Sequence, residues 1–130
     1  MEQRSRVRVL IADDHPIVRS GLKALVDAQT DMFVVGEAVD GVDVLAVVAS
    51  LLPDIVVMDL SMPNLGGIDA TERLHQTHPD VKVLALTVHE EPAFMRRLLA
   101  AGASGYVVKR AAAEDLVSAI RVIAGGGVYL

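Results

Sequence analysis

Apolar and polar positions alternate along the chain in blocks that predict strands and helices in regular succession. Runs rich in β-branched and other apolar residues predict buried strands at residues 7–12, 33–38, 55–58, 81–88 and 105–108. Segments with helical spacing of apolar positions lie between and after these runs, starting at Pro16 and then covering residues 42–52, 68–75, 93–101 and 113–124. The pattern therefore predicts five β/α units.

The first of these helices has the clearest pattern. Pro16 suits the first helical position, where its missing N–H group is no loss. Apolar residues then fall on one side of the helix and polar residues on the other: Ile17, Val18, Leu22, Leu25 and Val26 against Arg19, Ser20, Lys23 and Asp27. This division is typical of an amphipathic helix that turns one face toward a core.

Alternating strands and helices favour an α/β fold, in which a parallel sheet is covered by helices on both faces and the crossovers are right-handed. We expect a flavodoxin-like, doubly wound (βα)5 domain with strand order 2-1-3-4-5. In that order the winding reverses between the first and third strands, and ligands bind beyond the carboxyl ends of those strands. Asp13 and Asp14 follow the first strand, and Asp59 ends the third.

Composition indicates a soluble protein with an aliphatic core. The 130 residues suit one domain, and the content of 52% hydrophobic but only 3% aromatic residues is typical of an α/β core. No apolar run reaches membrane-spanning length, and Asp13 interrupts the N-terminal apolar run too early for a secretory signal. Together with the absence of cysteine, these features predict a cytoplasmic location and no membrane partner.

The charge pattern argues against direct binding of nucleic acid by this segment. The net charge is −5, and the basic residues are scattered, with adjacent pairs only at Arg96 with Arg97 and at Lys109 with Arg110. Binding to a phosphate backbone needs a basic face, and no such face is visible in the sequence. We therefore expect no contact with DNA through this segment alone.

Asp59 stands at the end of an apolar run, shortly before the turn signal of Met62 and Pro63. A strand buried on both faces offers an unpaired carboxylate no water, so Asp59 needs a counter-charge. Asp13 and Asp14 would converge with it at the switch point, and such like charges repel unless a cation joins them. Carboxylate ligands without cysteine favour a hard ion, and we predict Mg²⁺.

Two further side chains fall on the same edge of the predicted sheet. Thr87 lies beyond the core of the fourth strand, and Lys109 follows the fifth. A hydroxyl and an ammonium beside a metal-bound carboxylate suit an anion with several oxygens, and phosphoryl is the natural candidate. Asp59 can attack phosphorus to give an acyl phosphate while Mg²⁺ and Lys109 neutralise the equatorial oxygens. We therefore predict that Asp59 is the nucleophile.

The residues of this predicted site fall in four motifs that can be compared with known families. They are Asp13-Asp14-His15-Pro16, Met58-Asp59-Leu60-Ser61-Met62-Pro63, Leu86-Thr87 and Gly105-Tyr106-Val107-Val108-Lys109. In order and spacing the chain resembles a response-regulator receiver domain along its whole length, and in particular the NarL/FixJ subgroup, whose full-length members carry a LuxR-type helix-turn-helix. One departure is Gly66, which stands where an acidic or amide residue often precedes glycine.

The resemblance implies a phosphoacceptor and a metal site. Asp59 is the expected phosphoacceptor. Asp14 and Asp59 are expected to bind Mg²⁺ directly together with the backbone carbonyl of Ser61, and Asp13 to act largely through water.

The resemblance also implies switch and rate-tuning residues. Thr87 is expected to close on the phosphoryl group, Lys109 to pair with it, and Tyr106 to report the change by rotating. Ser61 and His89, each two residues beyond a site residue, flank the path by which water attacks the acyl phosphate. We expect these two side chains to tune the phosphoryl lifetime.

By the same resemblance, the chain is the receiver domain of a two-component response regulator that takes phosphoryl from a cognate histidine kinase. It is expected to be a signalling switch rather than a metabolic enzyme, one that catalyses its own phosphorylation and dephosphorylation and changes its self-association when phosphorylated. Residues 1–124 would form the receiver, and residues 125–130, with their glycine run, would begin a linker. That linker would lead to a C-terminal DNA-binding domain, through which alone DNA is contacted.

Plainer interpretations exist for single residues. Thr87 could reflect β-propensity, Lys109 could be solvated, and the two acids before Pro16 could merely cap a helix. Taken alone, Tyr106 fits a partly buried core aromatic. It is the position of these residues at the ends of separate strands that favours a common site.

Other classes of protein fit the motifs less well. His75 and His78 are better explained as histidines near a helix C-terminus than as zinc ligands. A phosphatase with an aspartate nucleophile would need a second acid where Ser61 stands. A cobalamin-binding module would need glycine in place of Val18, and a dinucleotide-binding module would need a glycine-rich turn after the first strand.

Overall fold

Five parallel strands form one sheet in the order β2-β1-β3-β4-β5, as the hydrophobic pattern predicted. The computed structural model describes residues 6–130. The strands are β1 (Val7–Ala12), β2 (Met32–Ala38), β3 (Ile55–Asp59), β4 (Lys82–Thr87) and β5 (Gly105–Val108). This order confirms the flavodoxin-like, doubly wound fold.

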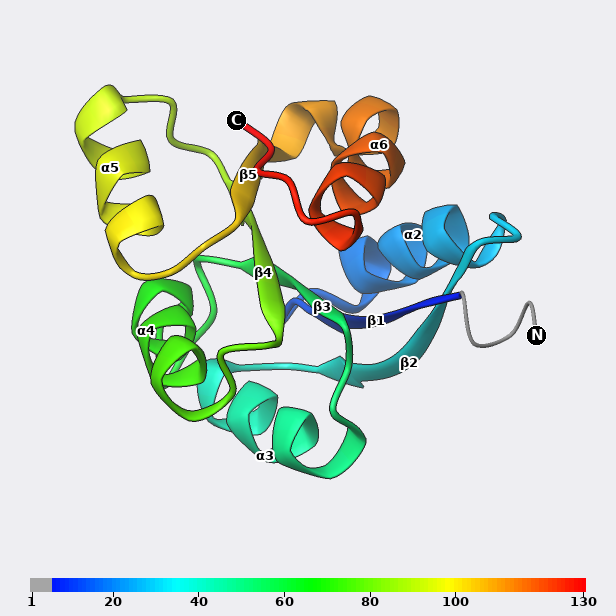
Figure 1. Ribbon diagram of the computed structural model, residues 1–130, viewed down its shortest axis with the longest axis horizontal. Coiled ribbons are helices and arrows are strands. Elements are labelled where there is room, and N and C mark those ends of the chain that lie inside the picture. Colours follow the sequence, from blue (N-terminus) through cyan, green and yellow to red (C-terminus); the bar gives the residue numbers. More distant parts are fainter. Residues whose placement is uncertain (1–5) are drawn as a thin grey trace.

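Each strand is followed by a helix (Figure 1). The helices are α2 (Pro16–Asp27), α3 (Gly41–Leu51), α4 (Gly67–Thr77), α5 (Pro92–Ala100) and α6 (Ala112–Ala124), and a 3₁₀ turn, η1 (Lys109–Ala111), precedes the last of them. Within residues 6–130, none of these helices combines the length and the apolarity needed to cross a membrane.

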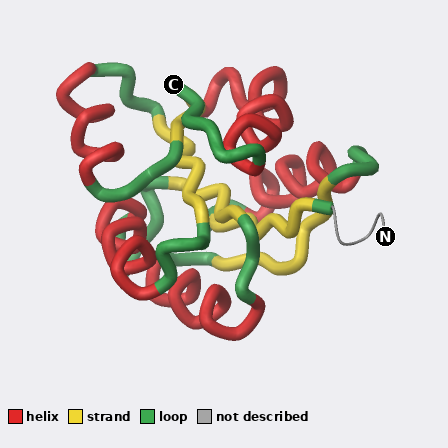
Figure 2. The backbone as a smooth tube through the Cα atoms, in the orientation of Figure 1, coloured by secondary structure: helices red, strands yellow, loops and turns green. Residues whose placement is uncertain are grey.

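The helices cover both faces of the sheet (Figure 2). Side chains of successive strand residues point to opposite faces, so Val9 and Ile11 pack with α2 and α6, whereas Leu10 packs with α3 and α4. Helix α5 packs through Met95 and Leu98 on the α3 and α4 face, near the β5 edge. Because both faces are covered, the central strands are apolar except near their ends.

The first turn of α2 departs from the predicted apolar face. Leu22 and Val26 are buried, but Ile17 is 87% exposed and Val18 is also exposed. The helix begins beyond the carboxyl end of β1, so its first turn has no strand beneath it. These apolar side chains therefore lie beside the predicted site.

The segment after α6 returns to the sheet. Gly126 has a φ of +96°, a left-handed conformation that glycine adopts without strain, and the chain turns back toward β5. The N–H of Tyr129 donates to the carbonyl of Ser104, and the N–H of Tyr106 donates to the carbonyl of Tyr129, each at 3.0 Å. The last residues thus lie along the open edge of β5.

Candidate functional site

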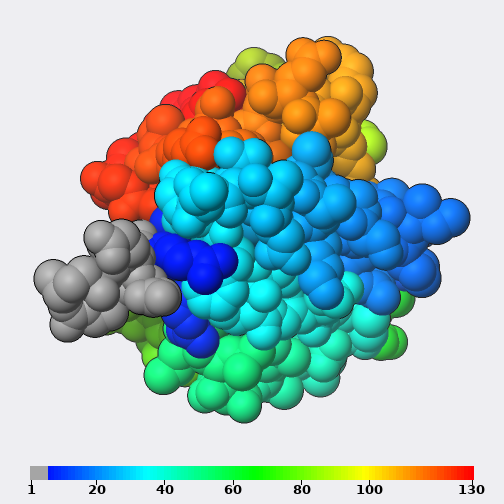
Figure 3. Space-filling view, turned by 90° about the vertical axis from the view of Figure 1, so that its right-hand side faces the viewer, coloured from blue at the N-terminus to red at the C-terminus, as the bar shows by residue number. Residues whose placement is uncertain are grey.

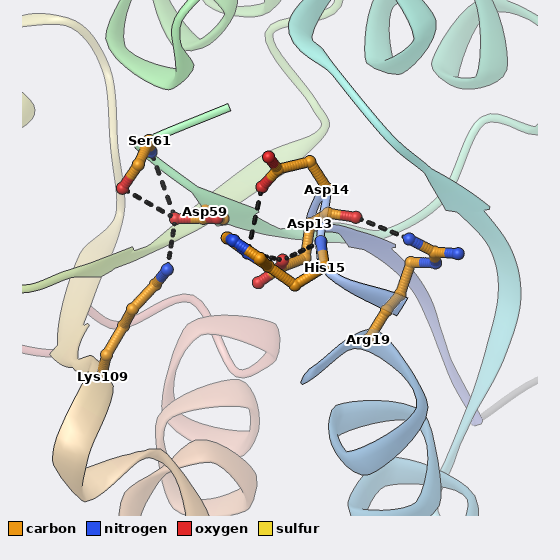
Figure 4. A network of polar contacts seen from close by, with 7 residues as sticks. All are labelled: Asp13, Asp14, His15, Arg19, Asp59, Ser61 and Lys109. Carbon is orange, nitrogen blue, oxygen red and sulfur yellow. Dashed lines mark hydrogen bonds and ion pairs between the residues drawn. The ribbon is translucent and has the colours of Figure 1, made fainter. Parts of the chain in front are cut away.

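The acidic residues meet at the carboxyl edge of the sheet, where β1 and β3 are neighbours (Figure 4). Ala12 of β1 is paired with Met58 of β3. The residues that follow them, Asp13 and Asp59, therefore come together at this edge. Ligand atoms of Asp13, Asp14, His15 and Asp59 all lie within 4.8 Å of one another. The structure therefore brings together the three carboxylates that the sequence placed at the switch point.

Asp59 is completely buried, and its two carboxylate oxygens have different surroundings. Oδ1 lies 2.8 Å from Nζ of Lys109 and accepts hydrogen bonds from the backbone N–H of Ser61 at 3.1 Å and from its hydroxyl at 3.3 Å. Oδ2 has no hydrogen-bond partner among the described residues. The carboxylate is thus held through one oxygen, while lone pairs of the other remain available.

Two more carboxylate oxygens share this condition. Oδ2 of Asp13 and Oδ1 of Asp14 are buried and accept no hydrogen bond within residues 6–130, although Oδ1 of Asp14 has an ion-pair contact with His15 at 3.2 Å. Buried carboxylate oxygens without donors are costly, and a cluster of them is more so. A hard cation with oxygen ligands would satisfy all of them at once, so the residues present fit Mg²⁺.

His15 belongs to this cluster, although the sequence analysis assigned it no role. Its Nδ1 lies 3.1 Å from Oδ1 of Asp13 and 3.2 Å from Oδ1 of Asp14, and its backbone N–H donates to Asp13 at 2.8 Å. His15 is also the N-cap of α2, which has no side-chain cap, so the two acids do not serve as helix caps. A histidine next to two acids was the only signal in the sequence.

Thr87 ends β4 with its side chain buried at the same edge. Its hydroxyl oxygen accepts a hydrogen bond from the N–H of His89 at 3.0 Å. The His89 ring itself lies 3.4 Å from Glu91 and 4.4 Å, between centroids, from the ring of Phe94. In this state the imidazole of His89 is thus held by the residues that begin α5.

Tyr106 is partly buried on β5 and packs against the apolar cluster around α5, which contains Ala85, Met95, Leu98 and Ala103. Through its backbone it also holds Tyr129 of the returning C-terminal segment. The Tyr106 side chain thus contacts the α5 cluster, while its backbone holds the C-terminal segment.

Ion pairs and hydrogen bonds connect the loops at this edge of the sheet. Arg110 in η1 makes two contacts with Glu90 in the loop after β4, at 2.6 and 3.2 Å. The Arg110 guanidinium lowers the pKa of the Glu90 carboxyl below its usual value of 4.5. Asp40 caps α3 through the N–H of Asp43 and accepts from Asn64 in the loop after β3, and these bonds lower its pKa below 3.8.

A doubly wound sheet with acidic residues, a threonine and a lysine around its switch point suits the binding and transfer of a phosphoryl group. Comparison with known protein families supports this interpretation of the site, since the model of the response regulator receiver domain matches residues 9–121. The chain belongs to the response regulator receiver domain family.

Individual relatives indicate which subgroup of this family the chain resembles most. The chain is 44% identical over 124 residues to response regulator GacA from Pseudomonas viridiflava, covering 95% of this chain but 58% of that protein. A LuxR-family response regulator structure from Aurantimonas sp. SI85-9A1 is 40% identical with a TM-score of 0.92, covering 97% of this chain and 90% of that one. The receiver domain of the putative response regulator NarL from Mycobacterium tuberculosis is 32% identical with a TM-score of 0.89, covering 94% and 98%.

These relatives confirm the predicted NarL/FixJ subgroup. The chain is a receiver domain of the LuxR/NarL type of two-component response regulator, a phosphorylation-activated signalling switch. It spans little more than half the length of the curated relatives it matches.

Proposed function

We propose that Asp59 accepts a phosphoryl group and that the chain itself catalyses this transfer. The observation that carries the proposal is the pairing of a completely buried carboxylate with Lys109 at 2.8 Å on one oxygen, while the other oxygen has no donor among the described residues. A buried carboxylate that is held through one oxygen and leaves the other free of donors is a suitable nucleophile for phosphorus.

In the proposed reaction a carboxylate oxygen of Asp59 forms a bond to phosphorus as the bond from phosphorus to the donor's leaving group breaks. From a phosphohistidine donor, the electron pair of the broken bond goes to the imidazole nitrogen, which takes a proton from solvent. Lys109 shifts its ammonium from the carboxylate toward the phosphoryl oxygens, and the Thr87 hydroxyl donates to one of them. These charges and donors act mainly by positioning and electrostatic stabilisation.

We assign the metal site to Asp14, Asp59 and the backbone carbonyl of Ser61, with Asp13 acting through water. Three buried carboxylate oxygens without hydrogen-bond donors in the described part of the chain support Mg²⁺ there. When bound, Mg²⁺ would neutralise charge on the phosphoryl oxygens. In this assignment Asp13 and Asp14, which follow β1, supply the carboxylates on that side of the ion.

The chemistry is tested by intact mass after incubation with Mg²⁺ and acetyl phosphate. The parent chain should gain one phosphoryl group, and Asp59→Asn should gain none because the nucleophilic oxygen is lost. Asp69→Asn is the matched control, since Asp69 is an exposed acid of α4 outside the site. Labelling of Asp59→Asn at the parent's rate would refute the assignment.

The physiological donor in this proposal is a cognate histidine kinase, consistent with the family. Exposed apolar side chains surround the mouth of the site, among them Ile17 on α2 and Val88 after β4, which is 64% exposed. Such a rim suits the docking of the kinase domain that carries the phosphohistidine. Ile17→Ser should slow transfer from the phosphorylated kinase but leave labelling by acetyl phosphate unchanged, and equal slowing of both would contradict docking.

Output in this proposal depends on Thr87 and Tyr106. When Thr87 turns toward the phosphoryl group, its hydroxyl leaves the N–H of His89, and the loop that leads to α5 is released. Tyr106 follows because it packs against α5. This population shift would change self-association, with a homodimer in the phosphorylated state, or contacts between domains. Amide shifts confined to the Asp59 loop on adding beryllofluoride would argue against it.

Lifetime of the acyl phosphate is assigned to Ser61 and His89. The Ser61 hydroxyl already contacts Asp59, whereas His89 is held by Glu91 and Phe94 and must leave them to reach the path of water. His89→Ala should change the decay rate several-fold without changing Mg²⁺ affinity. An unchanged decay rate would make His89 only a surface residue.

For the whole protein we propose a cytoplasmic transcriptional regulator with residues 1–124 as receiver and residues 125–130 as the start of a linker to a C-terminal DNA-binding domain. The greater length of GacA and the membership of the Aurantimonas response regulator in the LuxR family support this arrangement. Reading the gene beyond the codon for Leu130 tests it directly.

A further inference from the structure

Arg19 has a position that the amphipathic pattern does not explain. It is the fourth residue of α2, close to the helix N-terminus, where the helix dipole disfavours a cation. The sequence pattern places it on the polar side with Ser20 and Lys23, which are exposed. The Arg19 side chain, however, is only 18% exposed. A partly buried cation at this end of a helix needs a compensating partner.

Two contacts account for its burial, and Figure 4 shows the one with Asp13. One guanidinium N–H donates to the backbone carbonyl of Asp13 at 2.8 Å, and Nε donates to a carboxylate oxygen of Glu37 on β2, also at 2.8 Å. Lys23 lies farther away, 3.8 Å from the other oxygen of Glu37. Arg19 thus connects α2, the end of β2 and the acidic loop after β1.

We propose that Arg19 is a positioning residue for the metal site, acting through the peptide that joins Asp13 to Asp14. The N–H of Asp13 donates to the carbonyl of Ala38 at 3.0 Å, so β2 already holds one side of this residue. Arg19, anchored on Glu37, holds the other side. Because the peptide unit is planar, fixing the Asp13 carbonyl also fixes the orientation of the Asp14 N–H and Cα. Both carboxylates are thereby directed toward Asp59.

A purely electrostatic role of Arg19 predicts the opposite change in Mg²⁺ affinity when the guanidinium is removed. If the charge of Arg19 mattered most, its removal would make the site more negative and strengthen binding of a cation. Glu37 already offsets that charge at 2.8 Å, so the contribution of Arg19 is geometric. Loss of the guanidinium should therefore weaken cation binding, as loss of an outer-shell partner generally does.

The test is a Mg²⁺ titration followed by backbone amide shifts, which measures binding without any turnover. Arg19→Met keeps the apolar stem and should raise the dissociation constant about tenfold. Glu37→Gln, a milder change that leaves Arg19 in place, should raise it less. Lys23→Met is the matched control on the same helix and should bind as the parent does. A second readout is acetyl phosphate labelling, in which Arg19→Met should need more Mg²⁺ but reach nearly the parent's maximal rate.

Unchanged or tighter Mg²⁺ binding in both Arg19→Met and Glu37→Gln, with thermal stability lowered, would overturn the inference and leave Arg19 a structural residue. The inference rests on the proposed metal site, and the two can fail separately. If the parent shows no Mg²⁺ shifts that depend on Asp14 and Asp59, the proposed site fails. If the parent binds Mg²⁺ and the Arg19 and Glu37 variants bind equally well, only the role of Arg19 fails.

Discussion

Lys109 and Asp59 meet at 2.8 Å although the strands that lead to them are not neighbours, because β4 lies between β3 and β5 in the sheet. The lysine side chain crosses the end of β4, where Thr87 is buried. The Lys109 side chain is one-quarter exposed, while the Asp59 side chain is inaccessible. Thus Lys109, the only cation in contact with Asp59 within residues 6–130, reaches it from β5 across Thr87, the residue that we expect to move.

The first prediction follows from this pairing. Lys109→Met removes the cation and leaves a buried carboxylate, which should lower the free energy of unfolding by about 2 kcal/mol in metal-free buffer at neutral pH. Urea denaturation measures the loss. Lys82→Met, at an exposed lysine of the opposite edge of the sheet, should be close to neutral. Added Mg²⁺ should reduce the deficit of the Lys109 variant, and a variant as stable as the parent without metal would contradict the prediction.

The second prediction concerns the metal-free acidic cluster. In Asp13→Asn the amide oxygen can still accept the hydrogen bond from the N–H of His15. The amide NH₂ group replaces Oδ2 of Asp13, a carboxylate oxygen that has no hydrogen-bond donor in the described structure. Asp13→Asn should therefore raise stability in EDTA by about 1–2 kcal/mol.

Magnesium should reverse part of this difference. At 100 times its dissociation constant, a ligand that binds only the folded state stabilises by about 2.7 kcal/mol. The parent should gain more from Mg²⁺ than Asp13→Asn does, which thermal melts in EDTA and in Mg²⁺ can compare. A variant less stable than the parent in EDTA would show that the carboxylates do not repel one another in the folded state.

The strand order and the acidic cluster could be predicted because each depends on local patterns with a known geometric consequence. Apolar runs end at Ala12 and at Met58, each just before an aspartate, and parallel strands bring such ends together at one edge. The exposure of Ile17 and the burial of Arg19 could not be predicted in this way. Both depend on how far α2 extends past the sheet, which the helical period does not encode.

Contacts between distant loops were also beyond the sequence patterns. Glu90 and Arg110 are 20 residues apart and both exposed, so neither periodicity nor charge spacing relates them. The return of Tyr129 to β5 was missed for a different reason. A run of glycines fits a flexible linker and a tight turn equally well, and only the packing of the residues that follow distinguishes the two.

The third prediction concerns pH and the contact between α6 and the loop before β2. Arg121 on α6 donates to both carboxylate oxygens of Asp31, at 2.8 and 3.1 Å. In Figure 3 the orange surface of α6 adjoins the cyan surface of this loop. The Arg121 hydrogen bonds lower the pKa of Asp31 below 3.8, although burial opposes the shift. This pair links residues 90 positions apart in the chain.

Because the folded pKa of Asp31 is the lower one, its contribution to stability is present above pH 3.8 and is lost as the pH falls through the folded value. Asp31→Asn should therefore be less stable than the parent at neutral pH, with the difference disappearing below pH 3.8. Both side chains are about half exposed, so the effect should be small and weakened by salt. Urea midpoints across the pH range measure it, and a constant difference at all pH values would exclude a role for the Asp31 charge.

The last prediction concerns the edge of β5, where Gly105 permits the close approach of Tyr129. A Cβ atom at position 105 would lie 2.3 Å from the Tyr129 carbonyl oxygen, so Gly105→Ala should displace the C-terminal segment from the sheet. Hydrogen exchange should then accelerate at the amides of Tyr106 and Tyr129, whose bonds join the two segments, but not at Val57 in the centre of the sheet. Gly21→Ala is the control, since open space surrounds a Cβ there and alanine favours the helix. If Tyr129 remains protected in Gly105→Ala, backbone pairing does not hold this segment. If it is released, backbone pairing at the open edge of β5 is what holds this segment on the sheet.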